Sequence, residues 1–259
     1  MSISRSFLPI VTAFLLTAGA PLFPAEEFGD ISGQFVFEGP IEPRSPILKA
    51  GGGGGLPGFF KDIPDESLVV DKTTKGIANV FVYLRRAPEK KSPVPAPDAE
   101  KEPEVVITAK DYRFEPRAVV VRTSQKLRFV SRSPLAENIH TYTLANNQRN
   151  YVLKARDQKG VAFGFEKGET LPMPVKSDFH PWMRTTILVM DHPYAAVTDQ
   201  DGKFTIRGLP AGEHKFRVWH EMSGLIDREW KVEVVGGKLT EIPPVQVPAA
   251  KLKKNVGPT

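Results

Sequence analysis

The chain has 259 residues, a formal net charge of +5 and no cysteine. Its length allows one large or two modest domains with a hydrophobic core. The lack of cysteine excludes disulfide bonds, thiolate metal ligands and cysteine nucleophiles. Basic and acidic residues are interspersed along the chain, which is typical of a solvated surface and argues against nucleic-acid binding.

Residues 1–25 have the features of a secretory signal peptide. Arg5 precedes an apolar run from Phe7 to Ala18, and small residues follow it. The run is shorter than the roughly 20 residues of a membrane-spanning helix. We therefore expect a periplasmic or secreted protein with no stable membrane span after signal removal. An uncleaved membrane anchor is the alternative.

Residues 26–86 contain two predicted strands, Ile31–Phe37 and Ala78–Leu84, because both have β-type composition and end near turn residues. The five glycines from Gly51 to Gly55 predict a loop. They lack the Lys-Ser/Thr ending of a phosphate-binding loop. Residues 87–104 are rich in Pro, Lys, Glu and Ala, which predicts an extended linker.

Residues 105–192 predict a β-sandwich or barrel, because short β-type segments alternate with turn residues and show no helical period. The expected strands are Val105–Thr108, Ala118–Val121, Lys126–Val130, His140–Leu144, Val161–Phe165 and Thr185–Met190.

Residues 193–249 add further strands, including Glu213–Trp219 and Trp230–Val235. Asp201-Gly202 predicts a tight turn between two of them, because glycine tolerates a positive φ. Residues 250–259 form a predicted basic tail with Lys251, Lys253 and Lys254.

The first and last parts of the chain together resemble the carboxypeptidase regulatory-like domains, which are prealbumin-type β-sandwiches. The resemblance rests on Gly33–Val36, Gly76–Val82, Thr198–Phe204 and Leu209–Gly212. In that family the second and third motifs lie close together, whereas roughly a hundred residues separate them here. The resemblance thus implies that a second domain is inserted in a loop of the first.

The inserted residues 105–192 resemble the cupredoxins, especially those of planctomycete-type exported chains. The matching features are Phe114-Glu115-Pro116, Val119–Val121, Lys126–Val130, His140 and His180-Pro181-Trp182-Met183. The two resemblances together imply an all-β fold. A cupredoxin-like Greek-key domain would be inserted into a prealbumin-like domain made of residues 26–86 and 193–249.

The cupredoxin resemblance also implies a metal site. A blue-copper centre uses two histidines, one cysteine thiolate and a weak axial methionine. By position, His140 and His180 would be the imidazole ligands and Met183 the axial thioether. Ser177 stands at the cysteine position. A serine hydroxyl hardly ionises near neutral pH, so we expect no electron transfer through a blue centre.

The three remaining ligands leave two interpretations open. They could hold Cu(I), or Cu(II) in a colourless site, which suits a copper-binding or redox-accessory protein. Alternatively, the two histidines are hydrogen-bonded polar groups in a vestigial pocket while Met183 packs. The chain would then be a cell-envelope module that presents loops to a protein or glycan.

We expect no enzyme activity, because the sequence contains no Gly-x-Ser-x-Gly or His-Glu-x-x-His motif. Three other histidines, His192, His214 and His220, have no assigned role. We interpret His214 and His220 as interface or core residues beside aromatic rings, since about 20 Å separates two residues six positions apart on one strand.

Overall fold

The structure is a computed structural model that describes residues 27–50, 61–90 and 104–252. The predicted signal peptide, the glycine run and most of the predicted linker lie outside these residues. The described residues form seventeen strands and one short 3-10 helix. The all-β prediction is therefore confirmed.

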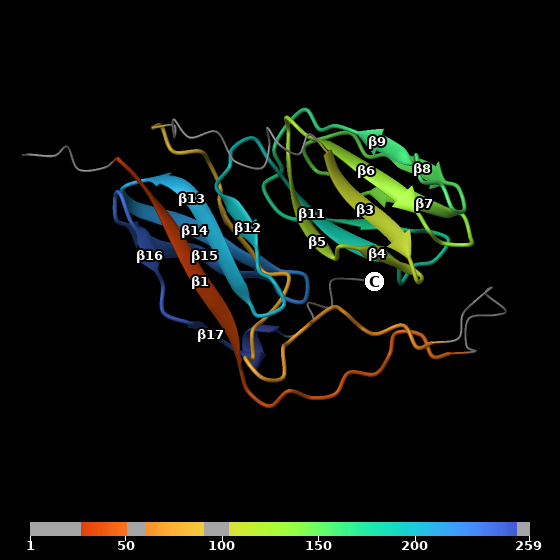
Figure 1. The fold of residues 1–259 in the computed structure, drawn as a ribbon, viewed down its shortest axis with the longest axis horizontal. Helices are drawn as coiled ribbons and strands as arrows, with labels where there is room; N and C mark the ends of the chain where they lie inside the picture. Colours follow the sequence, from red (N-terminus) through yellow and green to blue (C-terminus); the bar gives the residue numbers. More distant parts are fainter. Residues whose placement is uncertain (1–26, 51–60, 91–103, 253–259) are drawn as a thin grey trace, which may run out of the picture.

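Two sets of strands each enclose a separate hydrophobic core. We call them the outer unit (residues 27–50, 61–90 and 193–252) and the inner unit (residues 104–192). In Figure 1 the red β1 lies beside blue strands from the other end of the chain, while the yellow and green strands form the inner unit.

The outer unit has two sheets of four strands each. In the first, β1 pairs with β13, β16 and β17; in the second, the order is β12-β2-β14-β15. The strands are β1 (Phe28–Glu38), β2 (Phe81–Leu84), β12 (Ala195–Val197), β13 (Lys203–Pro210), β14 (Gly212–His220), β15 (Gly224–Val234), β16 (Leu239–Glu241) and β17 (Val245–Pro248).

The inner unit also has two sheets, with strand orders β5-β11-β10-β7-β8 and β4-β3-β6-β9. Its strands are β3 (Glu104–Lys110), β4 (Arg113–Glu115), β5 (Ala118–Arg122), β6 (Lys126–Ser131), β7 (Glu137–Thr141), β8 (Asn150–Leu153), β9 (Val161–Phe163), β10 (Met173–Lys176) and β11 (Arg184–Met190). Both sheets contribute side chains such as Phe129 and Ile139 to one core.

Strands β2 and β11 are buried on both faces, because each has a core on either side. Val82 of β2 belongs to the outer core, and Ile187 of β11 belongs to the inner core. Their neighbours Phe81 and Leu188 point the opposite way and meet in a third cluster between the units. The apolar sequence of β2 and the apolar run Ile187–Met190 that ends β11 match this double burial.

An ion-pair group joins the units beside that third cluster. Arg117 of the inner unit donates two hydrogen bonds, at 2.8 and 2.9 Å, to the Glu221 carboxylate of the outer unit. Arg184 lies 3.2 Å from the same carboxylate. The side chains of Arg117 and Glu221 are each only 13% exposed. The fixed geometry and low exposure make this group a specific contact between the units.

The turn predicted at Asp201-Gly202 is confirmed, since Gly202 has a φ of 77°. A Cβ atom at this glycine would lie 2.4 Å from the carbonyl oxygen of Phe35, so glycine is required sterically as well.

Several segments differ from the prediction. The strand predicted at Trp230–Val235 begins six residues earlier, in β15, and β4, β8 and β10 were not predicted. Residues 250–252, which we assigned to the basic tail, belong to the 3-10 helix η1 (Ala249–Leu252), because Leu252 is buried in the outer core. The strand predicted at His140–Leu144 is β7, and it begins three residues earlier, at Glu137. In the parts of the chain that the structure describes, no helix has the length and apolar character needed to cross a bilayer.

We predict that Glu221→Gln lowers the free energy of unfolding by about 2 kcal/mol, because it removes the negative charge facing two partly buried arginines. Urea denaturation measures the change. Glu229→Gln is the matched control, since Glu229 pairs with Lys215 at an exposed site, and it should have almost no effect. Equal losses in the two variants would contradict the role given to Glu221.

Candidate functional site

Strand β7 presents its side chains alternately to the two faces of its sheet. Ile139 lies in the inner core, and Glu137, two residues before it, is also wholly buried. His140 has the opposite orientation, and it pairs with Lys176 on the neighbouring strand β10. Glu137 and His140 therefore lie on opposite faces of the sheet.

The buried carboxylate of Glu137 meets two of the residues that the sequence singled out. The Ser177 hydroxyl donates a hydrogen bond of 3.0 Å to Glu137 Oε2, and Nδ1 of His180 lies 2.7 Å from the same oxygen. Burial raises the pKa of Glu137, although the hydrogen bonds from His180 and Ser177 act in the opposite direction. The pair is well shielded, because the His180 side chain is only 12% exposed.

The loop after β10 holds this group in a tight turn. The backbone N–H of Ser177 donates to the carbonyl of Met183 at 3.0 Å, and the N–H of Met183 donates to the carbonyl of His180 at 2.8 Å. The Met183 side chain is fully buried in the inner core. The His180 ring lies near Tyr112 and Trp182, with ring centroids 6.2 and 5.2 Å away.

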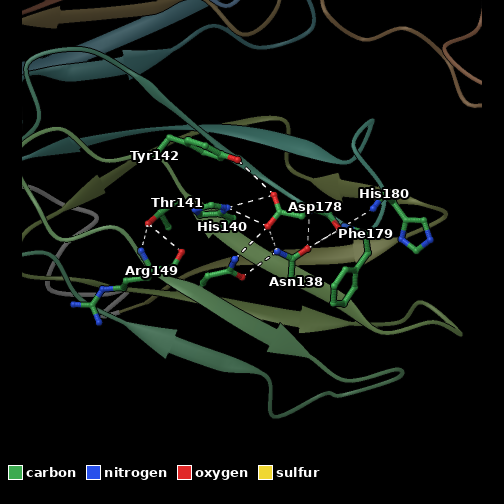
Figure 2. Close-up of polar contacts among 10 residues, drawn as sticks. Asn138, His140, Thr141, Tyr142, Arg149, Asp178, Phe179 and His180 are labelled. Atoms are coloured by element: carbon green, nitrogen blue, oxygen red, sulfur yellow. Dashed lines mark hydrogen bonds and ion pairs between the residues drawn. The ribbon is translucent and has the colours of Figure 1, made fainter.

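His140 belongs to a different group of contacts. Its Nδ1 lies 3.1 Å from Asp178 Oδ2, and its ring stacks on Tyr142 with centroids 4.4 Å apart. Figure 2 shows the ring of His180 pointing away from His140, with the Asp178 network between them. The structure thus brings Ser177, His180 and Met183 into one loop but does not bring His140 to them.

Glu137 is the residue that the sequence interpretation missed. Glu137 lies two residues before Ile139, and alternate residues of a strand point to the same face. A strand that begins at Glu137 therefore directs this carboxylate into the core together with Ile139. A strand predicted from His140 onward left Glu137 in a loop, where exposed charge is the usual expectation.

These residues do not fit a blue-copper centre. Ser177 supplies no thiolate, and Nδ1 of His180 faces a carboxylate instead of an open position. Glu137 Oε1 is buried without a hydrogen-bond partner, so one hard oxygen donor remains beside His180. Over the described ranges, no three His, Cys, Asp or Glu side chains lie close enough together to hold a metal ion.

The other three histidines have separate contacts. His214 Nε2 lies 2.7 Å from the carbonyl oxygen of Pro210. His220 and His192 are buried, and the Nδ1 of each accepts a hydrogen bond from a backbone N–H two residues later. Burial lowers the pKa of His192, and it lowers the pKa of His220 to about 4.

A cleft of about 1260 Å³ lies on the outer unit, away from Glu137, Asp178 and His180. Its floor is apolar and includes Phe37 and Leu252. Arg44 and Asp65 on its wall pair with each other. The wall charges are therefore partly neutralised within the protein.

No protein-family model matches the chain, and no curated protein matches it. Among solved structures, the chain is similar to amicyanin from Paracoccus versutus (Thiobacillus versutus), with 16% identity and a TM-score of 0.30 over 42% of this chain and 97% of amicyanin. It is also similar to a purple cupredoxin from Nitrosopumilus maritimus, with 14% identity and a TM-score of 0.28 over 33% of this chain and 98% of that one. TM-scores this low do not establish a common fold.

We predict that His180→Ala lowers the free energy of unfolding by about 3 kcal/mol, because it leaves the buried Glu137 carboxylate without its imidazole partner. His140→Ala is the control and should cost much less, since its partner Asp178 is 44% exposed. Urea denaturation of both variants measures the difference. If the costs are similar, Glu137 and His180 do not form the shielded pair described here.

We predict that the protein loses stability as the pH falls from about 6.5 towards 4. In this range the unfolded chain binds a proton at His220 before the folded protein does, so unfolding becomes more favourable. Thermal melting between pH 7 and pH 4 measures the loss. His220→Gln should reduce the dependence to the part that comes from His192, whereas His214→Gln should not change it. If the melting temperature of His220→Gln depends on pH as steeply as that of the unsubstituted protein, His220 is not a source of the pH dependence.

Proposed function

We propose that this chain is an exported, non-catalytic binding protein that does not carry electrons through a blue-copper site. The observation that carries the proposal is the 2.7 Å contact between Nδ1 of His180 and the buried Glu137 carboxylate. The proposal includes a cupredoxin-like inner unit and a carboxypeptidase regulatory-like outer unit. The inner strands form two sheets around one core, and the motifs of the second family lie on outer strands such as β1 and β13.

The chemistry of the pocket favours this proposal over electron transfer. A blue site needs a soft anionic thiolate and two free imidazoles. In this chain a carboxylate, a serine hydroxyl and one imidazole bind to one another instead. The network satisfies Glu137 Oε2, the Ser177 hydroxyl and Nδ1 of His180 internally, which is how buried polar groups are normally stabilised.

The same contacts favour a non-catalytic protein. A serine nucleophile needs a hydrogen bond to a general base such as histidine. The Ser177 hydroxyl donates to the Glu137 carboxylate, but Ser177 is only 1% exposed and Glu137 is fully buried, so a substrate does not reach this pair. We propose an envelope protein or glycan as the partner. The signal-like residues 1–25 support a periplasmic or secreted location.

Weak copper binding is the second candidate function. The unpartnered Glu137 Oε1 favours it, because a cation bound beside His180 would gain a carboxylate ligand. The sequence predicts a different ligand set for the same copper site, namely His140, His180 and Met183. Substitution of these residues tests it.

We predict that the mature protein binds neither Cu(I) nor Cu(II) stoichiometrically. Combining Glu137→His with Ser177→Cys should produce intense blue absorption with Cu(II), because it restores two imidazoles and a thiolate beside Met183. Calorimetric titration and visible spectroscopy measure both outcomes. Ser177→Cys alone should be much less coloured, since Glu137 would still bind His180.

His140→Ala separates the two ligand assignments. In the doubly substituted protein it should leave the blue colour intact, because His140 lies on the opposite sheet face. Loss of colour would instead assign His140 as a ligand. Stoichiometric copper binding by the unsubstituted protein, abolished by His140→Ala or His180→Ala, would favour the second candidate function and contradict the first.

A further inference from the structure

The sheet face opposite to Glu137 carries a separate group of polar and aromatic side chains. Three cross-strand pairs define it: Asn138 with Val152, His140 with Asn150, and Lys176 with His140. Directly opposed residues of antiparallel strands point to the same face. The group therefore spans β8, β7 and β10 on the side away from the inner core.

Asp178 lies at the centre of this group (Figure 2). Its carboxylate accepts hydrogen bonds from Asn138 Nδ2 at 2.6 Å and Asn150 Nδ2 at 3.2 Å, and His140 Nδ1 lies 3.1 Å away. Burial tends to raise the pKa of Asp178, but these hydrogen bonds outweigh it and lower the pKa. The result is an ionised carboxylate in a fixed orientation, with 44% of the side chain open to solvent.

Aromatic rings lie near the carboxylate. Figure 2 shows Tyr142 on one side of Asp178 and the Phe179 ring on the other side, beyond Asn138. Phe179 is 54% exposed, which is unusual for so large an apolar side chain, and nearby Val152 is 61% exposed. The Lys176 ammonium lies over the Tyr142 ring, 5.1 Å from its centroid. Exposed apolar surface thus borders a preorganised polar centre.

The charges on this face limit what it can bind. The Asp178 carboxylate repels phosphate and carboxylate ligands, while the Lys176 ammonium over the Tyr142 ring disfavours a cationic ligand. A purely apolar protein surface would desolvate Asp178 without giving it new donors. A neutral ligand with several hydroxyl groups avoids charge repulsion and also supplies hydrogen-bond donors to Asp178. Its hydroxyls donate to the carboxylate and accept from the amide N–H groups.

We propose that this face, centred on Asp178 and Phe179, binds a neutral hexose-containing glycan. The hydroxyls of one sugar ring bind Asp178 and Asn150, and the apolar face of the ring packs on Phe179. The inference deepens the proposed function, because it names the class of partner for the non-catalytic protein.

The test is calorimetric titration of the mature protein with cellohexaose, maltohexaose and mannohexaose, and with hexagalacturonate as an anionic probe. We expect at least one neutral hexasaccharide to bind and the anionic probe to bind more weakly. Asp178→Asn and Phe179→Ala should each weaken binding at least about tenfold. Leu239→Ala, at a 50% exposed apolar residue of the outer unit, is the matched control and should have no effect.

Three results would overturn the glycan site: no binding of any neutral probe, preferred binding of hexagalacturonate, or binding that both substitutions leave intact. Phe179→Ala keeps the test valid if Asp178→Asn unfolds the loop, because an exposed ring contributes little to folding. The copper titration is independent of this result. If the protein binds neither copper nor glycan, the glycan site is wrong but the proposed function remains, with a protein as the partner. Stoichiometric copper binding would contradict the proposed function.

Discussion

The two-residue period of a β-strand is the constraint on which both proposed sites depend. Glu137 and His140 are three positions apart on β7, so one side chain points to the inner core and the other to the outer sheet face. On the buried face of the sheet, Glu137 forms a closed network with Ser177 and His180. On the solvent-facing side of the same sheet, His140 belongs to the open group around Asp178. A shift of one residue in the register of β7 would exchange the two surroundings.

The same period joins the two units. Strands β2 and β11 each send alternate side chains into a domain core and into the cluster between the units, so neither strand has a solvent face. Apolar packing supplies contact area without direction. The Glu221 carboxylate, held by Arg117 and Arg184, adds a contact that is satisfied at one relative orientation of the units.

Much of the fold could be predicted from the sequence, because local composition decides it. The short strands, the Asp201-Gly202 turn and the lack of a thiolate all depend on neighbouring residues or on residue type alone. The surroundings of Glu137 could not be predicted in this way. They depend on the register of β7 and on Ser177, forty positions later, and a short apolar segment does not reveal where its strand begins. The double burial of β2 likewise depends on strands far away in the sequence.

The apolar cluster between the units also makes each unit depend on the other. Ala118, Leu188 and Met190 face the outer unit, so an inner unit transferred by itself to another protein would expose them to water and favour aggregation. The inner unit is therefore not an interchangeable module. Because Phe81 and Tyr83 pack in one cluster with Leu188, substitutions on one side restrict those accepted on the other.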